Sequence, residues 1–212
     1  MTRTRLEPRT EPQQQRSRDR VREILDATEA LVIEVGYDGI NTNLIAERAG
    51  MPVGTLYRYY SDKYGVFAAV AQRAFVDLET RWQELGQPDP DKTTIEDYFD
   101  GIVDMMAGFW MARKSAMLLW GVLRRTPEMQ TVSDDFDNIV ATRNAETLKR
   151  YYPGLGKKQR LAMGLVIEET GTAVLNKMVT MKTPARRELI QETKRLIRAY
   201  VVSLAPSRHD GR

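Results

Sequence analysis

The sequence predicts an all-α protein of about nine helices, and two patterns along the chain carry this prediction. Apolar residues recur at spacings of three and four through most of the chain, which is the period of an amphipathic helix. No segment shows the sustained alternation of apolar and polar residues that indicates a strand. Glycine and proline separate the helical patterns, most clearly in the linker Gly-Gln-Pro-Asp-Pro-Asp at residues 86–91.

Composition limits the chemistry available to the chain. Cysteine is absent and the one histidine, His209, lies three positions before the last residue, which argues against thiolate or histidine metal sites and most imidazole acid–base catalysis. We therefore expect no enzyme, no metal site and no cofactor, with a helical enzyme based on carboxylates as a remote alternative. No apolar run is long enough to span a bilayer, and the N-terminus lacks the apolar segment of a secretory signal, so we expect a cytoplasmic protein without membrane contact.

Positive charge is concentrated near the start of the chain, where arginine is frequent. The net charge is +3, and residues 1–63 carry ten Lys/Arg and ten Asp/Glu. A broad basic surface for nucleic acid is therefore missing, and DNA binding would have to rest on local geometry. Within residues 1–22, however, seven arginines face three acids. Residues 1–16 are polar and almost without apolar side chains, so we expect a disordered arm there. We also expect residues 206–212 to form a disordered tail.

Local signals place the first helices. A helical pattern begins at residue 17 and stops at Gly36, a normal C-terminal signal. Asn41 is expected to cap a short helix. The turn Ala-Gly-Met-Pro at residues 49–52 then leads into a second short helix, with Gly50 in a left-handed conformation. Asp62 and its neighbours cap a longer helix, and Thr93 with Glu96 predicts a capping box after the linker.

The two short helices joined by a glycine-containing turn are typical of a helix-turn-helix motif. In this motif the second helix lays its N-terminal residues into the major groove, so one face must pack and the other must be exposed. We expect Leu56 and Tyr60 to pack. The side chains expected to point outward are those of Val53, Thr55, Arg58 and Tyr59.

Residues 36–66, GYDGINTNLIAERAGMPVGTLYRYYSDKYGV, resemble the DNA-binding domain of the TetR family of transcriptional regulators. The matching positions are Ile45, Ala46, Ala49, Gly50, Gly54, Thr55, Leu56, Tyr57 and Lys63. The chain departs from the family pattern at Leu44, Pro52 and Tyr60, where an acid, a serine and a phenylalanine are frequent. The resemblance implies a three-helix DNA-binding domain at residues 17–64. The following helix joins it to a larger helical ligand-binding and dimerisation domain at residues 65–205.

The resemblance also implies roles for single residues. Thr55, Tyr57 and Lys63 would contact phosphates. The residues facing base edges would be Asn43, Val53, Gly54, Arg58 and Tyr59. Arg58 is the strongest candidate for direct readout, because a guanidinium contacts guanine O6 and N7 together. The alternatives are packing for Tyr57 and Tyr60, a solvated charge for Lys63, and an ion pair with Asp62 for Arg58.

The arginines beside the first helix form a further candidate site. Arg16, Arg18 and Arg20 are expected to reach the adjacent minor groove or a phosphate. The alternative is that they belong to a solvated tail.

Two apolar stripes in the last two long helices predict a dimerisation surface. They comprise Leu161, Leu165, Thr172, Leu175 and Val179, and Leu189, Ile190, Leu196, Ile197, Tyr200, Val201 and Leu204. Two copies related by a two-fold axis read a palindrome, and the resemblance implies a four-helix bundle across such a homodimer. The alternative is that both stripes are intramolecular core.

A region rich in aromatic residues and methionine precedes these stripes. The resemblance places an effector pocket here, with ordinary core as the alternative for each residue. The candidate ligand-binding residues are Met106, Phe109, Trp110, Met117 and Trp120, and the expected effector is small and largely apolar. The acids that interrupt the apolar pattern are expected at solvent or at an interface: Asp100, Asp104, Glu168 and Glu169.

The predicted function is a ligand-responsive transcriptional repressor. It would bind a palindromic operator in double-stranded DNA as a homodimer and be released by a small-molecule inducer. The alternative is a dimeric helical ligand- or partner-binding protein with a vestigial DNA-binding domain, which the balanced charge of residues 1–63 and Pro52 favour.

Overall fold

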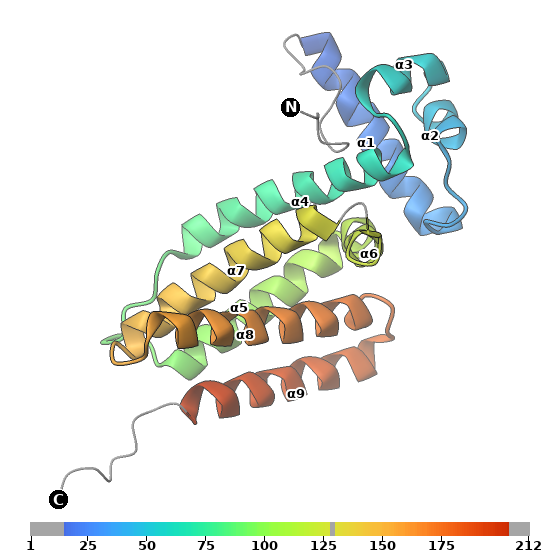
Figure 1. Ribbon diagram of the computed structural model, residues 1–212. Coiled ribbons are helices and arrows are strands. Elements are labelled where there is room, and N and C mark those ends of the chain that lie inside the picture. Colours follow the sequence, from blue (N-terminus) through green and yellow to red (C-terminus); the bar gives the residue numbers. More distant parts are fainter. Residues whose placement is uncertain (1–14, 128–129, 204–212) are drawn as a thin grey trace, which may run out of the picture. The chain divides into compact units, whose positions relative to one another are not determined.

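Figure 1 shows the computed structural model, which describes residues 15–127 and 130–203. These residues form α1 (Gln15–Val35), α2 (Thr42–Arg48), α3 (Val53–Tyr59), α4 (Lys63–Leu85), α5 (Ile95–Ala112), α6 (Lys114–Leu123), α7 (Gln130–Tyr151), α8 (Lys157–Met178) and α9 (Thr183–Val202). No strand occurs in the described ranges, so the all-helical prediction is confirmed there. None of their helices is long and apolar enough to cross a membrane.

The two terminal segments expected to be disordered lie almost entirely outside the described residues. Residues 1–14 and 206–212 are not among them. α1 begins at Gln15, two residues before the predicted start, so Arg16 belongs to the helix and not to the arm.

The described chain packs as two compact units. The first comprises the residues up to Trp82 and Arg113–Ser133, and the second comprises Gln83–Ala112 and the residues from Asp134 onward. This division by packing differs from the functional division expected at residue 64, which stays a prediction. The chain passes between the units within α4, within α7 and directly before α6.

The first unit has a core to which α1, α2, α3, α4 and α6 contribute. α1 packs against α2 and α6, and α2 packs against α3. The fully buried side chains include Ile24, Leu31, Ile45, Leu56, Val66, Phe67, Leu78 and Leu119. The rings of Phe75 and Trp120 meet edge to face, with centroids 4.6 Å apart, a geometry that stabilises beyond the burial of area alone.

The ends of the first helices follow the local signals. α1 ends directly before Gly36, whose φ of +72° is left-handed, and Gly50 turns the chain between α2 and α3 with a φ of +64°. Asn41 caps α2, because its side chain accepts the backbone N–H three residues later at 2.9 Å. Asp62 does the same for α4 at 3.0 Å. These four predictions are confirmed.

The start of α5 is shifted by one residue from its prediction. The capping pair is Thr94 and Asp97, not Thr93 and Glu96: the Thr94 hydroxyl oxygen accepts the Asp97 N–H at 3.1 Å. Both pairs have the spacing of a capping box. The helix takes the register that buries Ile95.

The second unit is organised around α5, which packs along α9, while α8 contacts both helices. Its core cluster comprises Ile95, Phe99, Leu148, Met163, Ile167, Ile197 and Val201. Asp104 pairs with Lys194 at 2.6 Å, and Asp100 pairs with Arg198. The hydrogen bond from Arg198 lowers the pKa of Asp100. These two acids therefore join α5 to α9.

Gly164 allows α8 to approach α7 closely. A Cβ at this position would lie 2.1 Å from the carbonyl oxygen of Ala141. Because backbone cannot move aside as the end of a flexible side chain can, Gly164→Ala should lower the free energy of unfolding by about 1–3 kcal/mol, the usual cost of overpacking. Urea denaturation measures this change. The control is Gly171→Ala on the same helix, where a Cβ meets nothing within 4 Å; an equal loss in both variants would contradict the prediction.

Candidate functional site

The helix-turn-helix of the first unit packs one face of α3 and exposes the other. Leu56 is completely buried, whereas Gly54, Tyr57 and Arg58 are exposed. Val53 and Thr55 are partly exposed. The packing of Leu56 is as predicted. The exposed face therefore offers a guanidinium, a phenol and a position without a side chain to a partner.

Tyr59 is placed differently from its prediction. Its side chain is only 5% exposed, and its hydroxyl donates to Ser17 Oγ of α1 at 3.4 Å. The expected outward orientation is therefore wrong. The reason is helical phase, because the position three after Leu56 lies on the same face as Leu56. Tyr60, which follows α3 in an extended conformation, is also buried. Burial raises the pKa of Tyr60 to about 12, although the positive charge of Arg73 opposes the shift.

The start of α2 lies beside the exposed end of Tyr57. The hydroxyl groups of Thr42 and Tyr57 are 2.9 Å apart and share a hydrogen bond. Asn43, the predicted base contact from α2, is exposed. The far end of α2 is tied to α1, because Arg48 donates to both carboxylate oxygens of Glu34 at 2.7 and 2.6 Å. The contribution of Thr42 was not predicted, and its place directly after the cap residue was the available signal.

The side chain of Lys63 is bound within the motif and is only partly exposed to solvent. Its side chain is partly buried, and Nζ donates to the backbone carbonyl oxygen of Ile40 at 3.1 Å. The same ammonium lies 5.6 Å from the ring centre of Tyr64 and 6.0 Å from that of Phe67. The predicted phosphate contact thus comes from a side chain that already has partners within the motif.

The three arginines of α1 do not share one face. Arg16, Arg18 and Arg20 are all exposed. Residues four apart on a helix lie on the same face and residues two apart do not, so Arg16 and Arg20 point together and Arg18 points elsewhere. Arg20 also pairs with Glu23 at 2.7 Å.

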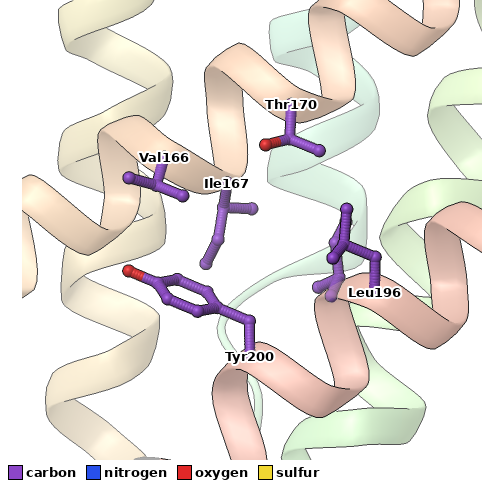
Figure 2. Close-up of a pocket in the computed structure, with 6 residues that line it drawn as sticks. Val166, Ile167, Thr170, Leu196 and Tyr200 are labelled. Atoms are coloured by element: carbon purple, nitrogen blue, oxygen red, sulfur yellow. The ribbon is translucent and has the colours of Figure 1, made fainter.

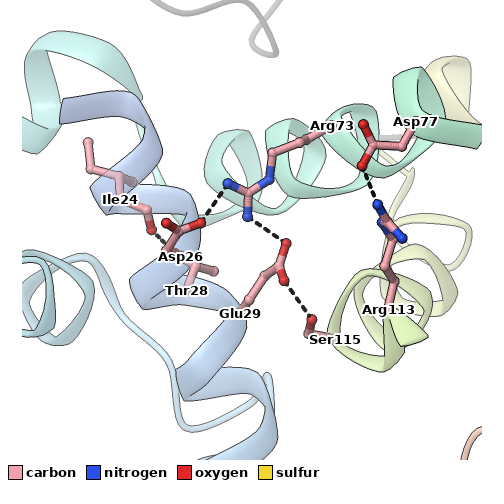
Figure 3. A network of polar contacts seen from close by, with 8 residues as sticks. All are labelled: Ile24, Asp26, Thr28, Glu29, Arg73, Asp77, Arg113 and Ser115. Carbon is pink, nitrogen blue, oxygen red and sulfur yellow. Dashed lines mark hydrogen bonds and ion pairs between the residues drawn. The ribbon is translucent and has the colours of Figure 1, made fainter. Parts of the chain in front are cut away.

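A polar network joins α1, α4 and α6 within the first unit (Figure 3). Arg73 of α4 pairs with Asp26 at 2.7 Å and with Glu29 at 2.6 Å, both on α1. The Ser115 hydroxyl of α6 donates to the other oxygen of Glu29 at 3.2 Å. Burial by itself would lower the pKa of Arg73, but the hydrogen bonds to Glu29 and Asp26 outweigh it and raise the pKa.

This network was not predicted from the sequence. Figure 3 also shows that Arg113, directly before α6, pairs with Asp77 of α4. The start of α6, where the chain re-enters the first unit, is therefore attached to the two long helices that support the helix-turn-helix. The available signal was Arg73, a charged residue inside the apolar run of α4.

The candidate effector residues are divided between the units. Met117 and Trp120 belong to the first, and Met106, Phe109 and Trp110 to the second. All except Met106 are buried. Because burial is expected for core as well as for a pocket lining, their ligand-binding role stays a prediction.

Three carboxylates of α7 and α8 lie close together in the second unit. One oxygen each from Asp137, Glu168 and Glu169 falls within 4.8 Å of the others. Glu169 is exposed as expected, but Glu168 is only 4% exposed, and its Oε1 accepts the Thr172 hydroxyl at 2.8 Å. The expected solvent position of Glu168 is therefore wrong. Acidic groups with such spacing occur without an ion, so the expectation of no metal site stays a prediction.

The two predicted apolar stripes are split between core and surface. Thr172, Leu175, Val179, Ile197 and Val201 are buried within the chain. Leu165 and Leu196 are 42% and 57% exposed, and Leu204 lies outside the described residues.

An apolar groove lies between α8 and α9. Figure 2 shows Val166, Ile167 and Thr170 of α8 facing Leu196 and Tyr200 of α9. The groove has a volume of about 90 Å³, and Val166 beside it is 48% exposed. This part of the α8–α9 surface therefore leaves apolar side chains uncovered in the single chain.

Curated relatives of this chain include HTH-type transcriptional repressors. The chain is 35% identical over 79 residues to the HTH-type transcriptional repressor KstR of Rhodococcus jostii, a match covering 37% of this chain and 35% of that protein. It is 38% identical over 64 residues to KstR of Mycolicibacterium smegmatis, covering 30% and 31%. The chain thus matches about a third of the length of these relatives.

Solved structures share the fold. A putative TetR-family transcriptional regulator from Syntrophomonas wolfei superposes with a TM-score of 0.71 at 16% identity, covering 88% of this chain and 97% of that chain. The family model described as bacterial regulatory proteins, tetR family, matches residues 24–70. The model described as tetracyclin repressor-like, C-terminal domain, matches residues 94–200, which is half of the chain. The chain therefore belongs to the TetR family of transcriptional regulators.

Proposed function

We propose that this chain is a repressor that binds a palindromic operator as a homodimer and is released by a small-molecule effector. The observation that carries the proposal is the exposed face of α3, where Gly54, Tyr57 and Arg58 are accessible while Leu56 anchors the helix. A major groove admits such a helix. The similarity to the KstR repressors supports repression as the direction of control.

The DNA contacts follow from exposure and chemistry. Arg58 reads a base edge and Val53 makes apolar contact. The hydroxyls of Thr55 and Tyr57 and the ammonium of Lys63 contact phosphates. Gly54 allows close approach of the backbone, and Asn43 reaches the groove from α2. Tyr59 is left out because it is buried. Arg16 and Arg20, on one face of α1, contact the backbone or the neighbouring minor groove.

Arg58→Ala is expected to relax sequence preference at one base pair in each half-site. A bidentate contact to a base discriminates by about 1–3 kcal/mol, whereas a phosphate contact affects all sequences equally. Fluorescence anisotropy with the operator and its single-base variants measures the change. The control is Arg187→Ala, an exposed arginine of α9 in the other unit. A uniform loss for all sequences would show that Arg58 contacts phosphate instead.

The proposed homodimer forms through α8 and α9. Its support is the uncovered apolar surface of Leu165, Val166 and Leu196 and the groove beside them. A second copy would cover this surface from water and gain hydrophobic stabilisation. A two-fold axis would also present two α3 helices to the two halves of a palindrome.

The proposed effector binds among the apolar residues predicted above and acts by a shift of population. A ligand releases DNA only if it binds the DNA-free conformation more tightly than the bound one. α4 supports this route, because it begins directly after the helix-turn-helix and continues past Trp82 into the second unit. A displacement of α4 would therefore change the placement of α3.

The experiment that tests the proposal is DNA binding by fluorescence anisotropy at two salt concentrations. The first fragment is the DNA directly upstream of the chain's own gene. Tight binding that resists competitor DNA and weakens steeply with salt supports an operator, because neutralised phosphates release counterions. If binding is only weak and indifferent to sequence, a selection from random sequences follows. A second failure would favour the ligand-binding protein with a vestigial DNA-binding domain.

A further inference from the structure

Lys63 connects two segments of the helix-turn-helix that are distant in sequence. It is the first residue of α4, and its ammonium donates to the carbonyl oxygen of Ile40, 23 residues earlier, at 3.1 Å. The rings of Tyr64 and Phe67 lie within 5.6 and 6.0 Å of the same nitrogen. Phe67 is completely buried, so one side of the ammonium faces the core of the first unit.

The accepting carbonyl stands at the start of α2. Ile40 is 2% exposed and directly precedes Asn41, the residue that caps α2. A bond to this carbonyl therefore holds the cap in place relative to the start of α4. Since α3 lies in the chain between these two points, the bond from Lys63 closes a loop that contains the recognition helix.

Helix stability does not explain a lysine at this position. A cation at the N-terminus of a helix is opposed by the helix dipole. The position is instead suited to donation: an ammonium has three N–H donors, and the bond to Ile40 leaves donors for a phosphate oxygen. One side chain can therefore hold the motif and contact the DNA backbone at the same time.

We propose that Lys63 is a positioning residue that sets the placement of α2 and α3, in addition to its phosphate contact. The DNA part of this inference rests on the proposed function, and the part concerning the motif does not. If Lys63 only contacted phosphate, its loss would weaken binding to all DNA sequences alike. If it also positions α3, its loss reduces the preference for the operator over other DNA.

The first test uses hydrogen exchange in the protein without DNA. Lys63→Met keeps the aliphatic stem and removes the donors. The backbone amides of Leu44 and Ile45, at the start of α2, should exchange about tenfold faster, as expected for the loss of a hydrogen bond from a charged donor. Lys63→Arg should restore protection, because a guanidinium also donates. Lys158→Met, at an exposed lysine of α8, is the control for lost charge.

Unchanged exchange at Leu44 and Ile45 in Lys63→Met would overturn the proposal. If the methionine variant does not fold, Lys63→Leu provides the comparison, since leucine keeps an apolar side chain and has no donor. This measurement needs no operator, so it decides the positioning role even if the proposed function fails.

The second test compares operator and random DNA by anisotropy. For Lys63→Met the ratio of the two affinities should fall about tenfold, and Lys63→Arg should recover it. Equal losses for both DNAs, with a salt dependence reduced by about one phosphate contact, would leave Lys63 as a phosphate ligand alone.

Discussion

Leu196→Glu is expected to convert the proposed homodimer into monomers and to lower operator affinity by about 10²–10⁴-fold. Two linked half-site contacts gain this much over one, because the second contact forms at a high effective concentration. Leu196 lines the α8–α9 groove and is 57% exposed in the single chain. A glutamate there is solvated in the monomer but would place a carboxylate in the proposed apolar interface. Light scattering coupled to size-exclusion chromatography measures the oligomeric state, and anisotropy measures the affinity.

The matched control for this experiment is Ile139→Glu. Ile139 is an apolar residue of α7 with a similar exposure of 55%. The substitution Ile139→Glu introduces the same charge at a position that does not line the α8–α9 groove. If Leu196→Glu remains dimeric, or if both variants dissociate equally, the assignment of the interface to α8 and α9 is wrong.

Trp120→Ala is expected to lower the free energy of unfolding by about 3–5 kcal/mol, the range for removing a large aromatic side chain from a core. The indole is 1% exposed and packs edge to face on Phe75 within the first unit. Urea denaturation measures the loss. Met106→Ala, at a partly exposed position of the second unit, should cost less.

This comparison also separates the two interpretations of the candidate effector residues. If Trp120 lines a preformed cavity, truncation would enlarge the cavity and change effector binding with little loss of stability. A large loss of stability identifies Trp120 as core. Loss of effector binding in Met106→Ala at unchanged stability would assign the pocket to the α5 side.

The features that local sequence predicted well are those that depend on a few neighbouring residues. Asn41 caps the helix that begins at the next residue, and Gly50 turns the chain where a left-handed conformation is needed. The start of α5 shows the limit of such signals. Two neighbouring Thr–acid pairs satisfied the same rule, and the burial of Ile95 against distant residues selected the second.

The candidate site shows the same limit at the level of single side chains. Tyr59 and Tyr60 are adjacent, and sequence spacing alone assigned one inward and one outward. The structure buries both: Tyr59 lies on the same helical face as Leu56, and its hydroxyl also meets Ser17 of α1, 42 positions away in the chain. Likewise, Glu168 follows a polar pattern in the sequence but lies buried beside Thr172.

By itself the sequence determined the helical fold, the helix-turn-helix and the residues that carry the family motif. These properties follow from the 3.6-residue period, from caps and from turn glycines, all of which act over a few positions. Only the tertiary structure decided which side chains remain accessible to DNA and which are already bound within the protein. The Lys63 ammonium donates a hydrogen bond to Ile40, 23 positions away, and the Ser115 hydroxyl donates one to Glu29, 86 positions away. Burial and hydrogen-bond partners are set by such distant segments, because packing brings them together and no local pattern encodes their meeting.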